Sequence, residues 1–338
     1  MSDSIRKDKI KKRNESIDYL KGVLIFYVVY GHCLYWMGEG IEKPYTIIVK
    51  FIYSFHMPLF IFISGYFFSS IKNKDIIGNI IKKFKRLIVP HFFFNIIMLI
   101  PIFCFWKQYG HFITRETNGT ITLKSVYLYL TMFWYLWCIF LSSVLCNIIY
   151  KTCKNHPKEI CILLSIVFWG FSQLTSINLF FVHQRMGDMF LYFVFGMIVY
   201  DYMDFTKSIV LTLLFITIYV FYLFLLYQYD DIHPIIVEVG QLGGIITMYY
   251  IILFFYNIKF AKKYFLFISE WTLGIYIYHF VVLYGIMAWF NNELGYLNNS
   301  LIIIHMIIAL VTTTICALFS KVLTFYTPLS KIALGNKK

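Results

Sequence analysis

The run SIDYLKGVLIFYVVYGHC, residues 16–33, places Lys21 and His32 eleven positions apart in a largely apolar segment. In a helix, eleven residues exceed three full turns by about 20°, so both side chains lie on one face. They are about 16 Å apart along the axis. Lysine binds anionic groups, and histidine titrates near neutral pH and acts as a general base. This face could therefore bind an anionic group at one end and move a proton at the other.

These residues also have structural interpretations. Lys21 lies only a turn inside the segment and could extend to the lipid headgroups. His32 lies deeper and could be a buried histidine that is hydrogen-bonded to a neighbour. Asp18 could pair with Lys21 or Lys11, since side chains at helical spacing share a face.

Residues 55–68, FHMPLFIFISGYFF, form a second apolar segment with polar members. His56 and Ser64 are eight positions apart and close to one face. Pro58 predicts a bend, because it frees a backbone carbonyl, and Gly65 lets another backbone or a ligand approach. Helix packing would explain Ser64 and Gly65, but His56 in the same segment favours a functional role. If this segment packs antiparallel to residues 17–37, His32 and His56 lie at similar depth.

A basic stretch, IIKKFKRLIVP, occupies residues 80–90. Its cations could enforce the positive-inside rule or meet anionic lipid. They could equally bind a phosphate-rich cytosolic ligand, because lysine and arginine make charge-assisted hydrogen bonds to phosphate. The four basic residues are Lys82, Lys83, Lys85 and Arg86.

Three later features have no single interpretation from the sequence. FWYLW, residues 133–137, is more typical of an aromatic belt or a packing cluster than of a ligand stack. Arg185 could be a polar outer contact or an ordinary loop arginine. The segment ISEWTLGIYIYHF, residues 268–280, begins with Ser269 and Glu270 and carries His279 near mid-membrane.

The composition predicts the elements that hold these residues. Of 338 residues, 60% are hydrophobic and 14% are charged, whereas soluble domains average about 25% charged. Apolar stretches of about 20 residues recur, as in helices that span a bilayer. We therefore predict an all-α, polytopic membrane bundle of about ten transmembrane helices, near residues 17–37, 46–69, 87–106, 125–149, 160–175, 188–203, 208–229, 234–257, 268–290 and 301–323.

Lysine and arginine counts predict the orientation. With a cytoplasmic N-terminus, the inner connections hold 22 of them and the outer connections six. Both termini should then be cytoplasmic: residues 1–16 as a basic segment, 17–326 as the membrane domain and 327–338 as a tail. The net charge of +13 then reflects topology, and no nucleic-acid partner is expected. The seven cysteines show no metal-ligand spacing, so we expect small buried hydrophobes and no metal site.

Taken together, these segments resemble the acyltransferase-3 family of integral membrane O-acyltransferases, particularly its fucose 4-O-acetylase-like branch. The resemblance runs from about residue 14 to the C-terminus. Many members have arginine at the position of Lys21, which keeps the charge and changes the geometry. The motifs on which the resemblance rests are Ile17-Asp18 through Lys21 to His32, His56 to Phe68, Lys83 to Arg86 before Pro90, Ser269 to His279, and Phe133 to Leu136.

The resemblance implies an enzyme of the bacterial inner membrane that moves an acyl group, most simply acetyl from acetyl-CoA on the cytoplasmic side, to a sugar hydroxyl of a polysaccharide or glycan. His32 would be the general base or a transient acyl carrier. Lys21, Lys83 and Arg86 would bind the coenzyme phosphates. Residues expected to support His32 or the acceptor are Asp18, His56, Ser64, Trp134, Arg185, Ser269 and His279.

Two other function classes fit parts of the pattern. Intramembrane histidines and a proline-interrupted helix also suit a transporter or flippase for a glycolipid or small polar solute. Such a protein would need no coenzyme A and would often show paired repeats, which are not evident. An intramembrane hydrolase is less favoured, because the sequence holds neither GxSxG nor HExxH.

Overall fold

The computed structural model describes residues 3–37, 43–69, 75–104, 133–174, 185–202, 209–229, 231–293 and 302–335. These residues are almost entirely helical and include no strand, which confirms the expected all-α class. Among them, seven helices are long and apolar enough to cross a membrane, and a bent helix pair would add an eighth. The chain is thus built as a multi-pass membrane protein. The count of about ten spans and the cytoplasmic position of both termini stay predictions.

Every predicted span coincides with helix, although the ends of several, chiefly residues 125–132, lie outside the described residues. The second predicted span consists of two helices. In chain order the helices are α1 (Asp3–Met37), α2 (Lys43–Tyr53) with α3 (His56–Ser69), α5 (Val89–Cys104), α9 (Trp134–Thr152), α10 (Pro157–Leu174), α11 (Met186–Tyr202), α12 (Ile209–Gln228), α13 (Pro234–Phe254), α15 (Thr272–Glu293) and α16 (Ile302–Leu323).

Four further helical elements lie wholly or mostly in segments that the span pattern treats as connections or tail, and two of them overlap the first residues of the predicted spans 87–106 and 268–290. They are α4 (Ile76–Lys83), the π-helix η1 (Phe84–Ile88), α14 (Lys259–Ser269) and α17 (Thr327–Ala333). α4 forms because its isoleucines recur on one face, as in an amphipathic helix. α14 and α15 meet at a bend of 87°.

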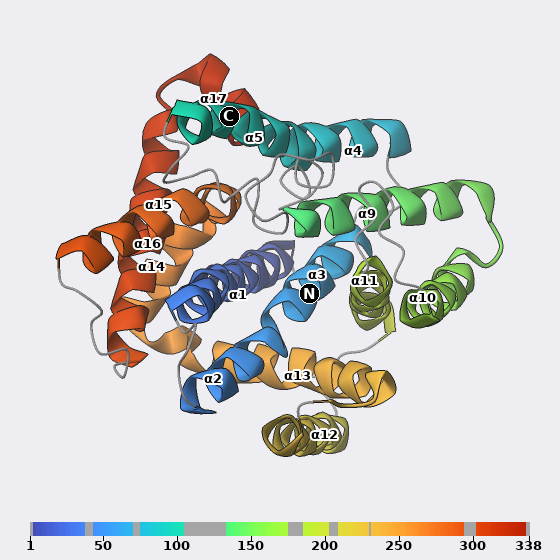
Figure 1. The fold of residues 1–338 in the computed structure, drawn as a ribbon. Coiled ribbons are helices and arrows are strands. Elements are labelled where there is room, and N and C mark those ends of the chain that lie inside the picture. The colour runs from blue at the N-terminus through green and yellow to red at the C-terminus, as the bar shows by residue number, and fades with distance from the viewer. Residues whose placement is uncertain are drawn as a thin grey trace. The chain divides into compact units, whose positions relative to one another are not determined.

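The described chain divides into two compact units. Unit 1 comprises Met1–Phe62 and Tyr202–Val322, and unit 2 comprises Ile63–Asp201 and Leu323–Lys338. In unit 1, α1 packs along α14 and α15, and α12 lies along α13 (Figure 1). Of the α1 span 78% is buried within the protein, against 11% of α12. α1 is therefore the core helix of unit 1, and its polar residues Asp18, Lys21 and His32 are partly buried.

Close backbone contact holds α1 in this position. A Cβ atom on Gly22 would collide with the backbone carbonyl of Phe265 on α14. The rings of Tyr19 and Phe26 contact the Phe265 ring edge-on, at centroid distances of 5.6 and 6.1 Å. Because Gly22 has no side chain, the two helix backbones approach closely enough for these rings to interlock.

Residues Ile47–Ser69 form one candidate span that is interrupted between α2 and α3, just before Pro58, so the predicted bend at Pro58 stays a prediction. Proline has no N–H to donate to the carbonyl four residues earlier, so the Ser54 carbonyl loses its helical hydrogen bond, whereas Ser54 N–H still donates to Lys50 and Leu59 N–H to Phe55. The Ser54 hydroxyl lies 2.7 Å from the Phe51 carbonyl oxygen, to which it donates, and 2.8 Å from the Tyr219 hydroxyl on α12. The break is thereby fixed against α12.

In unit 2, α9 packs against α4, η1 and α10, and α17 packs against α5. Gly65 lies against the backbone carbonyl of Phe193, which confirms the close approach expected there. Phe133 is buried, and its ring contacts those of His91 and Phe94 at 5.5 Å each. Trp137 also contacts His91, at 6.1 Å. Phe133 and Trp137 therefore belong to a packing cluster, as one interpretation of FWYLW predicted.

Gly22→Ala tests the α1–α14 contact. The added methyl must displace backbone, which costs about 1–3 kcal/mol, so we expect a clearly lower thermal unfolding midpoint in detergent. Gly285→Ala on α15 is the matched control, because nothing lies within 4 Å of its Cβ position and alanine favours helix. Equal midpoints for the Gly22→Ala variant and the wild type would contradict the close contact.

Candidate functional site

His32 lies on the core helix of unit 1 and contacts residues from two other helices. Its Nδ1 is 3.5 Å from the hydroxyl oxygen of Tyr53 on α2. The His279 ring from α15 stacks on it, with centroids 5.3 Å apart and planes 28° apart. The Phe280 ring lies at 5.0 Å. His32 is only partly buried, so the group with the best chemistry for proton transfer also remains reachable.

His279 is fully buried, and its proton position is determined by the backbone. Its Nδ1 lies 3.1 Å from the Ile275 carbonyl oxygen and 2.8 Å from that of Tyr276. Carbonyl oxygens only accept, so Nδ1 carries a hydrogen and the neutral ring presents Nε2 as an acceptor. That Nε2 has no hydrogen-bond partner among the described residues. His279 thus offers an acceptor beside His32.

Tyr53 connects His32 to the third histidine. The Tyr53 ring meets the His56 ring edge-on, with centroids 5.0 Å apart. His56 is buried at the start of α3, and its Nδ1 is 2.6 Å from the Ile52 carbonyl oxygen. Residues 32, 56 and 279, far apart in sequence, therefore converge with Tyr53 into one group, the histidine cluster.

Lys21 and Asp18 form an ion pair at the other end of the same helix face. The Lys21 ammonium lies 3.1 Å from the Asp18 carboxylate, and the side chains are 29% and 51% exposed. The expected Asp18–Lys21 pairing is therefore present. A partly exposed pair contributes at most about 1 kcal/mol, so an anionic ligand could displace the carboxylate at small cost.

Lys83 and Arg86 lie in unit 2, at the junction of α4 and η1. The Lys83 ammonium lies over the rings of Phe68 and Phe193, at 5.5 and 5.8 Å. Burial, with the nearby Arg86 charge adding to it, lowers the pKa of Lys83 to about 8. The ammonium is therefore poorly solvated, and a bound anion would stabilise it.

Arg86 is exposed within the π-helix, an uncommon element that occurs frequently at functional sites. Its backbone contacts Gly335 just beyond α17, where φ is +63°. A side chain at Gly335 would be strained by that φ and would collide with the Arg86 carbonyl. The C-terminal residues thus support the backbone that presents Arg86.

The remaining predicted residues have separate places. The Arg185 guanidinium lies over the Trp134 ring at 5.6 Å, so these two predicted residues do meet. Ser64 is partly buried beside Gly65 on α3. The Ser269 hydroxyl donates to the Leu266 carbonyl at 2.7 Å, at the bend before α15.

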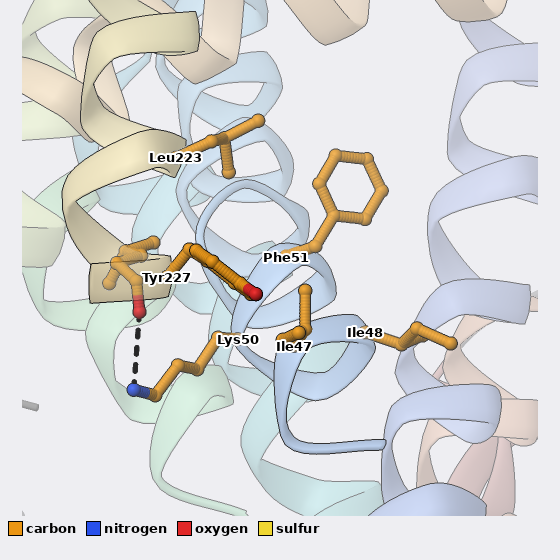
Figure 2. Close-up of a pocket in the computed structure, with 7 residues that line it drawn as sticks. Ile47, Ile48, Lys50, Phe51, Leu223 and Tyr227 are labelled. Atoms are coloured by element: carbon orange, nitrogen blue, oxygen red, sulfur yellow. Dashed lines mark hydrogen bonds between the residues drawn. The ribbon is translucent and has the colours of Figure 1, made fainter. Parts of the chain in front are cut away.

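A groove of about 240 Å³ lies between α2 and α12, one turn from Tyr53 (Figure 2). Beside Lys50, mostly apolar side chains line it. The Lys50 ammonium donates to the Leu226 carbonyl oxygen at 3.2 Å, near the C-terminal end of α12. This bond ties α2 to α12, because helix C-termini attract cations. The groove residues are Ile47, Ile48, Lys50, Phe51, Leu223, Leu226 and Tyr227.

Sequence reasoning missed two polar candidates. Tyr53 gives no distinctive signal, since it is one of 28 tyrosines, apart from its place three residues before His56. His91 is fully buried on α5 and lies 2.9 Å from the Asn95 amide nitrogen. A histidine in an apolar span is itself a functional signal, so His91 could have been found. No group of three or more metal-ligating side chains occurs among the described residues.

Comparison with known proteins identifies the family. Residues 14–321 match the acyltransferase domain of the acyltransferase-3 family. Nodulation protein NolL of Mesorhizobium japonicum is 31% identical over 144 residues, which cover 40% of this chain and 36% of NolL, so the chain spans about a third of that relative. No solved structure matches. The chain belongs to the acyltransferase-3 family of acyl-transferring enzymes and is a multi-pass membrane protein.

Proposed function

We propose that this protein is an O-acyltransferase, most simply an O-acetyltransferase, which moves the acyl group of acyl-CoA to a sugar hydroxyl of a polysaccharide or glycan. The observation that carries the proposal is the histidine cluster on the core helix of a chain that belongs to an acyltransferase family. The bacterial cytoplasmic membrane is the proposed location, and the one curated relative described above is bacterial.

His32 is the proposed general base. The acceptor hydroxyl attacks the thioester carbonyl, so that a C–O bond forms and the C–S bond breaks. His32 takes the hydroxyl proton and returns it to the coenzyme A thiolate. The neutral Nε2 of His279, beside His32, can accept a hydrogen bond from the same hydroxyl or from a water in the site. Transient acylation of His32 is the variant of this mechanism if the acyl group must cross to an outward-facing acceptor.

The cations proposed for binding donor phosphates are Lys21 in unit 1 and, each considered within its own unit, Lys83 and Arg86 in unit 2. Lys21 shares a helix face with His32 about 16 Å away, a spacing that suits a long donor arm. Lys83 is held against aromatic rings, and Arg86 is presented by the π-helix. Phosphate oxygens would complete the solvation that Lys83 lacks.

Trp134 and Arg185 are the proposed contacts for the glycan. The guanidinium can donate several hydrogen bonds to hydroxyl oxygens, and the indole ring offers a flat apolar surface to a sugar face. Along α9, Trp134 and Cys146 are twelve residues, or about 18 Å, apart, and Lys83 lies near Cys146.

His32→Ala tests the base. Purified protein in nanodiscs is given acetyl-CoA and a glycan extract, and thiol release is followed. We expect His32→Ala to turn over at least about a hundredfold more slowly than wild type, with unchanged affinity for coenzyme A, because a positioned base accelerates a reaction about 10²–10⁴-fold. His156→Ala, at a histidine whose side chain is 74% exposed, is the control and should keep wild-type rates. Retained turnover in His32→Ala would remove His32 from the mechanism.

Arg86→Ala tests donor binding. Loss of a charge-assisted phosphate contact costs about 1.5–3 kcal/mol, so the KM for acetyl-CoA should rise about ten- to a hundredfold with a smaller change in kcat. Lys151→Ala, an exposed cation at the end of α9, serves as the matched control. If both variants keep the wild-type KM, the phosphates bind elsewhere.

The lowered pKa of Lys83 predicts a pH dependence. Only the ammonium form of Lys83 attracts phosphate. Its contribution to donor binding is therefore complete well below pH 8 and is lost as the pH rises through about 8. Wild-type coenzyme A should bind progressively more weakly between pH 8 and 9.5. Lys83→Arg should flatten this change, because guanidinium stays charged. Identical pH profiles for both proteins would show that Lys83 does not contact the donor.

A further inference from the structure

We propose that Tyr53 is the positioning residue for His32: its hydroxyl oxygen accepts a hydrogen bond from Nδ1–H of His32 and thereby leaves Nε2 as the basic nitrogen. The Nδ1–Oη distance of 3.5 Å is at the long end of the range for a hydrogen bond. This inference rests on the proposed acyltransfer for its kinetic consequence, although the proton position can be measured without any substrate.

The residue before His32 is shaped for this contact. A Cβ atom on Gly31 would lie 3.1 Å from Cε2 of the Tyr53 ring and 3.3 Å from the Ile52 methyl Cγ2. The bare backbone of Gly31 therefore lets the Tyr53 ring lie against α1 beside His32. Any larger residue would move the ring by a few tenths of an ångström and lengthen a hydrogen bond that is already long.

Tyr53 is also held from its own side. The Lys50 ammonium, three residues earlier on α2, donates to the Leu226 carbonyl of α12 at 3.2 Å (Figure 2). The Ser54 hydroxyl, next in the chain, lies 2.8 Å from that of Tyr219 on the same helix. Two bonds to α12 thus bracket Tyr53 and restrict how far α2 can shift along α1. A residue held in this way can orient an imidazole, as an acceptor orients the histidine of a catalytic triad.

The tautomer is the decisive consequence. A neutral imidazole has one N–H, and the nitrogen without it is the base. With Tyr53 as acceptor at Nδ1, the proton stays there and Nε2 can take the proton of the attacking hydroxyl. The opposite arrangement, in which the Tyr53 hydroxyl donates to Nδ1, would place the proton on Nε2 and block that role.

Solid-state NMR of histidine-labelled protein in lipid measures the tautomer directly, at a pH where His32 is neutral. Nine histidines contribute signals, and the signal absent in His32→Ala is that of His32. We expect Nδ1–H in wild type and a mixed or Nε2–H population in Tyr53→Phe, which keeps the ring and removes only the oxygen. Tyr27→Phe on α1, whose ring contacts Phe55 instead, is the matched control and should resemble wild type. An Nε2–H signal for His32 in wild type overturns the proposal.

A double-mutant cycle measures the effect on turnover. Tyr53→Phe should lower kcat about tenfold, the value of one hydrogen bond, with the KM for both substrates unchanged. Gly31→Ala should lower kcat in the wild-type background and add little in Tyr53→Phe, because no hydroxyl is left to displace. Additive losses, or losses in KM alone, would contradict the positioning role.

The two measurements separate the possible failures. Absence of acyl transfer in wild type together with an Nδ1–H signal that depends on Tyr53 would refute the proposed function and keep the positioning contact. Acyl transfer that depends on His32 and not on Tyr53 would refute the positioning and keep the function. Thermal unfolding of each variant identifies any loss that arises from misfolding.

Discussion

The burial of α1 within unit 1 is the constraint on which the candidate site depends. A polar or charged group inside a membrane is costly unless it faces protein or water. On α1, Asp18 and Lys21 offset part of this cost by pairing with each other, and His32 does so through its contacts with Tyr53 on α2 and His279 on α15. That burial relies on Gly22, which lets the α14 backbone approach, and on the rings packed around Phe265. The candidate chemistry is thus placed on the most buried of the candidate spans.

The histidine cluster shows how this core helix gathers groups from elsewhere. α15 brings His279, and the junction of α2 and α3 brings Tyr53 and His56. Both contributions come from places where a helix is interrupted. The interruption before Pro58, which lacks a backbone donor, lies between Tyr53 and His56, and the 87° bend after Ser269 sets the direction of α15. With an uninterrupted helix at either place, the polar side chains beyond it would lie in different positions relative to His32. Irregular backbone therefore has a positional role here.

Unit 2 solves a different problem, because it must present cations without burying them fully. The π-helix and its contact with Gly335 present Arg86 toward solvent, while Lys83 lies over aromatic rings in a site whose burial disfavours its charged form. Burial disfavours the charged form of Lys83, and its lowered pKa reflects this. A bound anion would stabilise the charged ammonium of Lys83. A titratable group with a perturbed pKa often marks a functional site.

The sequence by itself determined the membrane class, the positions of the long apolar helices and the family, because apolar length and the ordered motifs are local properties of the chain; it did not indicate α4, α14 or α17. It also nominated His32, His56 and His279 separately, since a histidine in an apolar span is rare wherever it falls. The family resemblance suggested that His56 and His279 support His32 or the acceptor, but the sequence could not determine their contacts, that Tyr53 joins them or that Trp134 meets Arg185. Such contacts depend on which helices pack together and on rotation about each axis. Those depend on close packing at glycines such as Gly22 and Gly31, whose fit appears only when the facing helix is in place.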